Sequence, residues 1–311
     1  MSISKINGVA TDDVAKVDGV AVADIAKVDG VEWPAATSFL LDTFSGATLA
    51  FSFRQLKSGV SNCIDVVNSS GSTATIGFSG GYLDMDALDA HCGVGSGTIS
   101  RWYDQSGNNR HANQSTVSKQ PTIYSSGARV VVNSKMAASF DGNDRLVISA
   151  AQVHTGSFYA NCTIRTGSTV ANASILNQDD ANSSTRVRIA QYLRTASSGP
   201  TGRVVVFNTA VQNFADNSPA LTANTQIQIS AYATATGTIE AFDNGTTNGS
   251  SSYTGTLKTG SHELAIGSSV HGSSPSAFFT GHIQEVILFD GDQPSNRSSI
   301  ESDVDTFFSI P

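Results

Sequence analysis

Acidic residues are the side chains of this sequence with the clearest catalytic potential. A retaining glycosidase needs two carboxyl groups about 5–5.5 Å apart, one as nucleophile and one as acid. The best candidates are Asp179 with Asp180, Asp216 and Asp243, which lie in polar stretches typical of loops. Acidic residues in loops are usually solvated, and one fold can host many functions, so we expect no enzyme. Asp216 and Asp243 are kept as catalytic candidates for the alternative that the protein is an enzyme.

The segment 101–108 combines aromatic rings with amide and carboxyl groups, which are the side chains that suit carbohydrate. The candidate glycan-binding residues are Trp102, Tyr103, Asp104, Gln105 and Asn108. The same residue types also fit a strand followed by a turn, because Asp, Asn and Ser side chains bond to nearby backbone groups. We favour the turn and keep glycan binding as the alternative.

A metal site is weakly indicated at Asp141, Asn143 and Asp144, whose side-chain oxygens are suitable calcium ligands. The same residues fit a hairpin turn between strands at 138–140 and 145–148, and we favour this turn. The six histidines lack the spacing of a zinc site. The sequence therefore predicts no metal and no cofactor.

An eleven-residue repeat occurs at the start of the chain, with copies that begin at Lys5, Lys16 and Lys27; the third copy is incomplete. Each copy has Asn-Gly or Asp-Gly between β-branched residues, which is a strong turn signal. We expect short strand–turn–strand units. The alternatives are single helical turns at 13–16 and 24–27, or a tail that is ordered only on a partner.

These repeats cannot fold on their own side chains. Burying a Val or Ile side chain is worth about 1.5–3 kcal/mol, whereas ordering each residue costs about 1–2 kcal/mol of backbone entropy. We therefore expect residues 1–34 to be an attachment arm that docks on sister chains or on another protein. The predicted attachment residues are Ile6, Gly8, Val17, Gly19, Val28 and Gly30.

The composition limits the classes of partner. Of 311 residues, 39% are hydrophobic and 14% charged, with 28 glycines, a texture typical of all-β extracellular or virion proteins. A net charge of −8 without a basic run argues against nucleic acid and anionic membranes. No apolar stretch reaches the roughly 20 residues of a membrane span, and no signal peptide is visible, so we expect release by lysis. Three sparse cysteines are expected to be buried thiols, namely Cys63, Cys92 and Cys162.

Residues 35–311 are expected to form one mostly β domain. Alternation is cleanest at 158–165, where Phe158, Ala160, Cys162 and Ile164 point one way and the polar residues the other. Other strands are expected at 48–54, 129–132, 137–140, 145–148, 187–192, 204–207, 227–232, 238–242 and 279–289. Many short strands at regular spacing predict a sandwich or jelly roll.

Two helices are expected in this domain. One covers 84–92, with Asp84 as its N-cap, Met85 and Leu88 on one face, and Gly93 at its end. The other closes the chain as a short amphipathic helix. Its apolar stripe consists of Ile300, Val304, Phe307 and Phe308.

The body also resembles a known family. Over about residues 38–150, it is similar in the order and spacing of five segments to the catalytic-domain sandwich of α-L-arabinofuranosidase B. These segments are 51–56, 84–88, Arg101 to Asn108, His111 to Ser115 and Lys119 to Pro121. The phrases at 138–144, 264–267 and 279–289 resemble concanavalin A-like or laminin-G jelly rolls. The resemblance implies an all-β, antiparallel jelly-roll sandwich after a short repetitive arm.

The enzymatic part of that resemblance does not carry over. The family has an adjacent Cys-Cys pair at its sugar site, and this chain has none. No segment between 150 and 260 aligns with the family's catalytic carboxylates. An arabinofuranosidase-like glycoside hydrolase is therefore the alternative interpretation.

The arm resembles segments of phage tail-fibre and other virion proteins. We therefore expect a virion protein, in a tail fibre, spike or capsid decoration, that is made in the host cytoplasm and displays a lectin-like sandwich. Expected partners are other virion proteins through residues 1–34 and further copies of the chain. The binding hypothesis adds host surface glycan as a ligand of the sandwich.

Overall fold

The computed structural model describes residues 39–167, 172–179, 188–196, 199–207, 212–216, 221–270 and 275–310, and six two-residue strands between positions 5 and 32. The chain divides into two compact units, Met1–Phe39 and Leu40–Pro311. Among the described residues, no helix is both long enough and apolar enough to cross a membrane.

The arm contains three short antiparallel hairpins, one in each repeat. They pair β1 (Lys5–Ile6) with β2 (Val9–Ala10), β3 (Lys16–Val17) with β4 (Val20–Ala21), and β5 (Lys27–Val28) with β6 (Val31–Glu32). Each hairpin has the same register, with the first residue of its first strand, a lysine, opposite the last residue of its second strand. The expected strand–turn–strand units are thus present.

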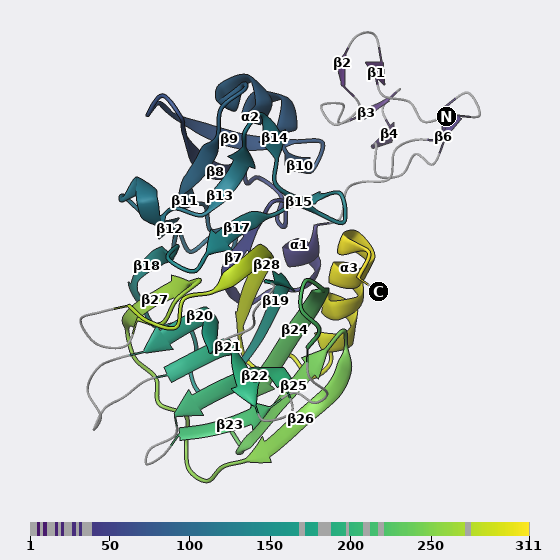
Figure 1. Cartoon of the computed structure of the whole chain (residues 1–311). Helices are drawn as coiled ribbons and strands as arrows, with labels where there is room; N and C mark the ends of the chain where they lie inside the picture. The colour runs from purple at the N-terminus through teal and green to yellow at the C-terminus, as the bar shows by residue number, and fades with distance from the viewer. Residues whose placement is uncertain are drawn as a thin grey trace. The chain divides into compact units, whose positions relative to one another are not determined.

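The body is an antiparallel sandwich, as expected (Figure 1). In its first sheet, β28 (Thr280–Asp290) and β19 (Phe158–Thr166) lie side by side in the centre. One side of this pair carries β7 (Ala47–Ser52), and the other carries, in order, β24 (Gln226–Ala233), β25 (Thr238–Asp243) and β26 (Thr246–Ser252).

The second sheet runs in an order that is almost that of the sequence. It begins with β12 (Ala112–Asn113), β18 (Leu146–Ala151) and β27 (His262–Ile266). It continues with β20 (Ala173–Asp179), β21 (Arg188–Ala196), β22 (Gly199–Phe207) and β23 (Gln212–Asp216). Figure 1 shows β21, β22 and β23 as neighbours in the lower part of the body.

Shorter strands connect the two sheets at one end. The strand β11 (Gly97–Trp102) pairs with β12 and also with β8 (Asn62–Asn68) and β13 (Thr122–Ser125). Around them lie β9 (Thr73–Ser79), β10 (Tyr82–Leu83), β14 (Ala128–Arg129), β17 (Ala138–Asp141), the hairpin of β15 (Val131–Val132) with β16 (Lys135–Met136), and the 3-10 turn η3 (Val117–Lys119). The connection runs from β12 of the second sheet through β11, β13 and β17 to β28 of the first sheet.

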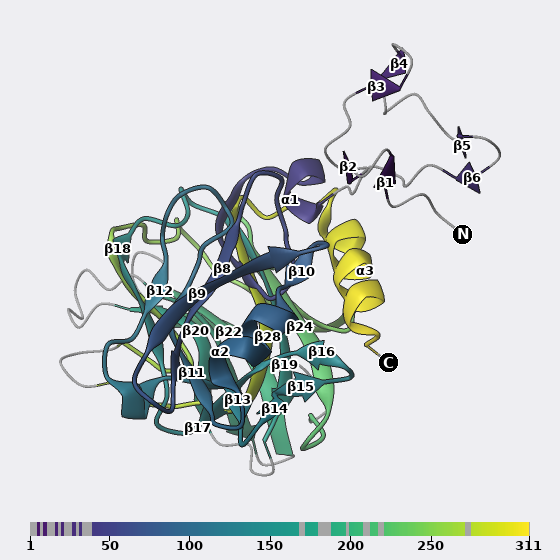
Figure 2. The same cartoon turned by 90° about the horizontal axis from the view of Figure 1, so that it is seen from above.

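The main core lies between the two sheets. Phe158, Ala160, Cys162 and Ile164 of β19 are all buried in it, as the alternation predicted. The opposite face of β19 departs from the usual pattern, because Tyr159, Asn161 and Thr163 are also fully buried. A second apolar cluster covers this face, which includes Tyr159, Leu40 of α1 (Leu40–Thr43) and Ile300 of α3 (Arg297–Phe308). Figure 2 shows both helices on the same side of the body.

Both expected helices form. The helix α2 spans Met85–Cys92, its N-cap Asp84 accepts a hydrogen bond from the Ala87 N–H at 3.0 Å, and Gly93 ends it with a φ of 56°. Leu88 is buried but Met85 is 39% exposed, so the expectation that both cover one apolar face is wrong for Met85. In α3, Ile300, Val304 and Phe308 are buried and Phe307 is half-buried, which confirms the predicted stripe.

Two local expectations are wrong. The residues 141–144 do not close a hairpin, because β17 pairs with β13 and β28 whereas β18 pairs with β12 and β27. Asp179, Asp216 and Asp243 do not lie in loops but are the last residues of β20, β23 and β25. The three cysteines, all within the described body, are buried thiols that form no disulfide with one another, as expected.

Candidate functional site

The loop between β11 and β12 is built around the carboxylate of Asp104, which is 6% exposed. Its Oδ1 accepts hydrogen bonds from the backbone N–H of Ala50 at 2.9 Å and of Ser106 at 3.0 Å. Its Oδ2 accepts from the Ser106 hydroxyl at 2.8 Å and from the Arg110 N–H at 3.0 Å. One side chain thus fixes the loop at three points, including the residue that begins its return to β12.

Gln105 and Trp102 hold the same loop to the core. The Gln105 amide accepts from the Leu56 N–H at 2.7 Å and donates to the carbonyls of Ser52 and Arg54, both at 3.0 Å. The Trp102 ring is stacked on Phe53, with 4.6 Å between ring centroids, and is fully buried. Trp102, Asp104 and Gln105 are therefore buried and bonded within the protein, and none of them presents an exposed surface to a ligand.

The other two candidate glycan-binding residues, Asn108 and Tyr103, also stabilise the loop. The Asn108 side chain is exposed, but its Nδ2 donates to the Ala47 and Thr48 carbonyls at 3.2 and 3.3 Å. Tyr103 is half-buried and donates from its hydroxyl to Asp65 at 3.1 Å. One aspect of Tyr103 faces the His111 ring, with 4.8 Å between centroids. Turn chemistry explains most of this segment, as favoured from the sequence.

The flanking residues, which the sequence reasoning did not select, line a polar cleft of about 540 Å³. The β11–β12 side of this polar cleft presents Arg101, Asn109, Arg110, His111 and Asn113. The opposite side consists of the end of β18 and the residue before β27: Ser149, Ala150, Ala151, Gln152 and Ser261. In Figure 1, β12, β18 and β27 lie together at the left of the body. The volume falls within the range of about 300–1,000 Å³ that is typical of ligand pockets.

His111 enters the polar cleft as a neutral hydrogen-bond donor. Its Nδ1 accepts a hydrogen bond from the Asp104 backbone N–H at 3.1 Å, so the ring proton is on Nε2. Partial burial lowers the pKa of His111; Asp104 and Asp65 oppose this shift, and Arg101 adds to it. At neutral pH the imidazole is therefore uncharged and can donate from Nε2.

The two arginines of the polar cleft are held differently. Arg101 donates from Nε to Asn113 Oδ1 at 2.8 Å, and its Nη1 lies 3.7 Å from Asp65 Oδ2. Arg110 is half-buried and donates from Nη1 to the Thr48 carbonyl at 3.3 Å. Among the described residues that line the polar cleft there is neither an Asp nor a Glu. The site therefore offers guanidinium, imidazole and amide donors together with amide and hydroxyl acceptors.

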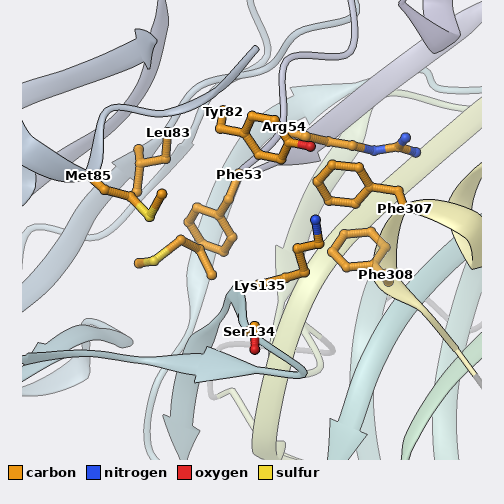
Figure 3. A pocket seen from close by; sticks show the side chains of 10 residues that line it. Phe53, Arg54, Tyr82, Leu83, Met85, Ser134, Lys135, Phe307 and Phe308 are labelled. Carbon is orange, nitrogen blue, oxygen red and sulfur yellow. The ribbon is translucent and has the colours of Figure 1, made fainter. Parts of the chain in front are cut away.

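A second hollow, the aromatic pocket, lies between β10, the β15–β16 hairpin and α3 (Figure 3). Its volume is about 190 Å³, below the usual range for ligand pockets. The rings of Tyr82 and Phe307 stack with centroids 5.4 Å apart, and Lys135 Nζ lies 4.4 Å from the Phe307 centroid. Arg54 also lies over Phe307, at 4.6 Å. These contacts attach α3 to the body, so we assign the aromatic pocket to packing.

The remaining site candidates do not assemble. Asp216 belongs to the second sheet and Asp243 to the first. Asp179 belongs to the second sheet, and Asp180 lies outside the described residues. Neither Asp179 nor Asp243 is among the described residues that line the polar cleft or the aromatic pocket.

The stretch 141–144 is a locally bonded turn. Asp144 Oδ2 accepts from the Asp141 N–H at 3.0 Å, Asp141 Oδ1 accepts from the Asn143 N–H at 2.8 Å, and the Asn143 amide donates to the Ser118 carbonyl at 3.0 Å. Burial raises the pKa of Asp144 to about 7, so a cation bound there would have to displace the proton at neutral pH. Within the described parts of the chain, no group of three or more His, Cys, Asp or Glu side chains could hold a metal ion.

Of the predicted attachment residues, Ile6, Val17 and Val28 occupy the second position of β1, β3 and β5. Each is paired with a valine across its hairpin. The three glycines, Gly8, Gly19 and Gly30, lie outside the described residues. Attachment through this unit stays a prediction.

The comparisons with known proteins bear on the fold. No protein-family model matches this chain, and no curated protein matches it. Among solved structures, the chain is similar to a GH54 α-L-arabinofuranosidase soaked with a cyclic sulfate inhibitor, with a TM-score of 0.63 and 18% identity. It is also similar to an arabinofuranosidase complexed with arabinofuranosyl-α-1,2-xylobiose, with a TM-score of 0.63 and 17% identity.

In both comparisons 83% of this chain is covered, against 62% of the other chain. The chain therefore spans less than two thirds of the length of these enzymes. The resemblance to the arabinofuranosidase sandwich is confirmed at the level of fold. At this identity it supports no statement about activity.

Proposed function

We propose that this protein binds carbohydrate and that the polar cleft holds the sugar. The observation that carries the proposal is the lining of the polar cleft, where Arg101, Asn109, Arg110, His111 and Asn113 converge opposite Gln152 and two serines. Sugar hydroxyl groups both donate and accept hydrogen bonds. Guanidinium and amide side chains such as these can form two hydrogen bonds with a pair of neighbouring sugar hydroxyl groups.

The rigidity of the site supports this function. The polar side chains are presented by strands β11 and β12 and by a loop that Asp104 and Gln105 tie to the core. Asn109 has a φ of 55°, a conformation that Asn adopts more readily than most residues, so the turn is compatible with its sequence. A preformed site loses little conformational entropy when a ligand binds.

The test is a glycan array probed with the full chain, followed by calorimetry on the strongest ligand with Arg110→Ala and Arg165→Ala. Arg165 is the matched control, because it too donates to one backbone carbonyl, that of Asn224 at 3.0 Å, but lines a different hollow. We expect Arg110→Ala to weaken binding at least about tenfold, the equivalent of 1.4 kcal/mol. Equal affinities for the two variants, or no ligand on the array, would overturn the proposal.

The second candidate function is glycoside hydrolysis, which the similarity in fold to arabinofuranosidases favours. The chemistry requires a carboxyl pair about 5–5.5 Å apart for retention or about 6.5–9.5 Å for inversion. None of the described residues that line the polar cleft is acidic, and Asp216 and Asp243 are on different sheets. We expect no release of nitrophenol from 4-nitrophenyl arabinofuranoside. Turnover that disappears in Asp216→Asn or Asp243→Asn would establish the enzyme.

We further propose that the arm attaches the sandwich to a larger assembly, a virion in which sister copies and other structural proteins are its partners. Three hairpins with one register and few large apolar side chains support docking of the arm on a regular surface. Electron microscopy of the source particle with an antibody against the body tests this location. Absence of the antigen from purified particles would contradict it.

A further inference from the structure

The titratable side chains among the described residues that line the polar cleft are either cationic or neutral. Its lining contains Arg101, Arg110 and His111, and no described acidic residue. Two carboxylates lie behind the wall. Asp104 already accepts hydrogen bonds from four donors. Asp65 accepts from the hydroxyls of Thr75 and Tyr103 and approaches Arg101.

Arg110 is the group whose charge is least compensated. Its side chain has one hydrogen bond, to the Thr48 carbonyl, and forms no ion pair with any described residue. A guanidinium carries five N–H donors in a rigid planar arrangement, so most of these donors remain available. Half-burial makes their hydration incomplete. A ligand group with two acceptor oxygens and a negative charge would satisfy them best.

The neighbours of Arg110 fit the same ligand. Arg101 adds a second guanidinium with an exposed side chain, 44% accessible, whose partner Asp65 lies at 3.7 Å. His111 adds a neutral N–H donor at Nε2. The hydroxyl groups of a neutral sugar could accept hydrogen bonds from Arg110, but they would leave the partly buried guanidinium charge without a counter-charge.

We infer that the glycan held in the polar cleft is an acidic one, whose sugar carboxylate binds the Arg110 guanidinium while its hydroxyl groups contact the amides and His111. This inference rests on the proposed function and specifies its ligand class. The net charge of −8 does not oppose it, because repulsion from distant charges is screened over about 8–10 Å at ordinary salt. Asp65 and Asp104 lie behind the wall and are already bonded, so the Arg110 guanidinium is the charged group that remains available to a ligand.

The experiment compares matched pairs of sugars that differ in the carboxylate: methyl glucuronide with methyl glucoside, methyl galacturonide with methyl galactoside, and sialyllactose with lactose. Affinities are measured by calorimetry or ligand-observed NMR at 0.05 and 0.5 M NaCl. We expect at least one acid to bind about tenfold more tightly than its neutral partner at low salt, with a smaller ratio at high salt. Arg110→Gln should abolish the ratio, whereas Arg165→Gln should retain it.

The outcomes separate this inference from the proposed function. Equal binding of the acidic and neutral members of every pair, or a ratio that survives Arg110→Gln, would overturn the acidic ligand while leaving carbohydrate binding intact. Absence of binding to every sugar, both here and on the array, would overturn the proposed function and the inference with it. A circular dichroism spectrum and melting curve for each variant verify that it is folded.

Discussion

Replacement of Asp104 by Asn tests how the loop creates the polar cleft. The substitution preserves size but puts an NH₂ group where one carboxylate oxygen accepts hydrogen bonds. If the amide oxygen faces Ala50 and Ser106, the NH₂ group faces the Arg110 N–H, which loses its acceptor. The Ser106 hydroxyl can reverse its role, whereas the backbone N–H cannot.

The cost follows from the bonds that are lost. An unsatisfied buried donor costs about 1–3 kcal/mol, and a hydrogen bond to a charged acceptor is worth about 1.5–3 kcal/mol. Some of this cost is recovered when the loop relaxes, so we expect the free energy of unfolding to fall by about 3 kcal/mol. A relaxed loop must be reordered when the glycan binds. At about 1–2 kcal/mol of backbone entropy per residue, one such residue weakens binding about 5- to 30-fold.

Urea denaturation followed by tryptophan fluorescence gives the stability change, and calorimetry with the array ligand gives the affinity. Asp86→Asn is the matched control, because Asp86 on α2 is fully exposed and its substitution should change stability by less than about 0.5 kcal/mol. Equal stability of the Asp104→Asn and Asp86→Asn variants would refute the account of the loop. A destabilised Asp104→Asn variant with unchanged affinity would show that the loop does not shape the sugar site.

Three further predictions concern the body and the arm. His154 is buried with neither ring nitrogen bonded to a described residue, and burial lowers its pKa to about 4. Because the unfolded state takes up the proton first, wild type should lose about 2 kcal/mol more stability than His154→Leu between pH 7.5 and 5, as measured by denaturation at each pH. Gly267→Ala should lower the free energy of unfolding, measured by urea denaturation, by about 3 kcal/mol or more, because its Cβ would lie 2.4 Å from the Phe140 ring and its φ is +85°. The control Gly59→Ala has a φ of +75° but open space around the Cβ, so it should lower the free energy of unfolding by only about 1 kcal/mol. Deletion of residues 1–34 should leave the melting temperature within a few degrees but abolish assembly; outright unfolding or normal assembly would contradict this role of the arm.

Much of the fold could be predicted from the sequence, because its strands alternate and its helix ends carry strong local signals. The Asp84 cap, the Gly93 end and the inward face of β19 are each set by a few neighbouring residues. The pairing of β17 and β18 could not be predicted in this way. A short polar stretch between two strands is compatible with a hairpin or with a crossing between sheets, and only distant partners decide.

The burial of the second face of β19 has the same origin. Tyr159, Asn161 and Thr163 are all fully buried, and Tyr159 packs in the cluster that includes Leu40 of α1 and Ile300 of α3. The packing of helices from both ends of the body on this face is a tertiary event, without a signal in the strand itself. The Tyr159 hydroxyl lies 3.3 Å from the Glu301 carboxylate, which shows that the helix brings polar partners with it.

The proposed site borders the segment that the sequence singled out, but it is lined mainly by neighbouring residues. Asp104, Gln105 and Asn108 are good ligands for a sugar and equally good ligands for a backbone, and in the folded chain the backbone binds them. A usable signal was present in the flanking sequence. Arg110 and His111 in this flanking stretch carry a guanidinium and an imidazole, and both line the polar cleft.

The most direct test of the central claim is a crystal structure of the protein soaked with the tightest-binding sugar from the array. The account predicts density for the sugar in the polar cleft, between Arg101–Asn113 and Ser149–Gln152, with an oxygen within hydrogen-bond distance of the Arg110 guanidinium. Density in the aromatic pocket beneath α3, or at another surface with the polar cleft unaltered, would contradict the account.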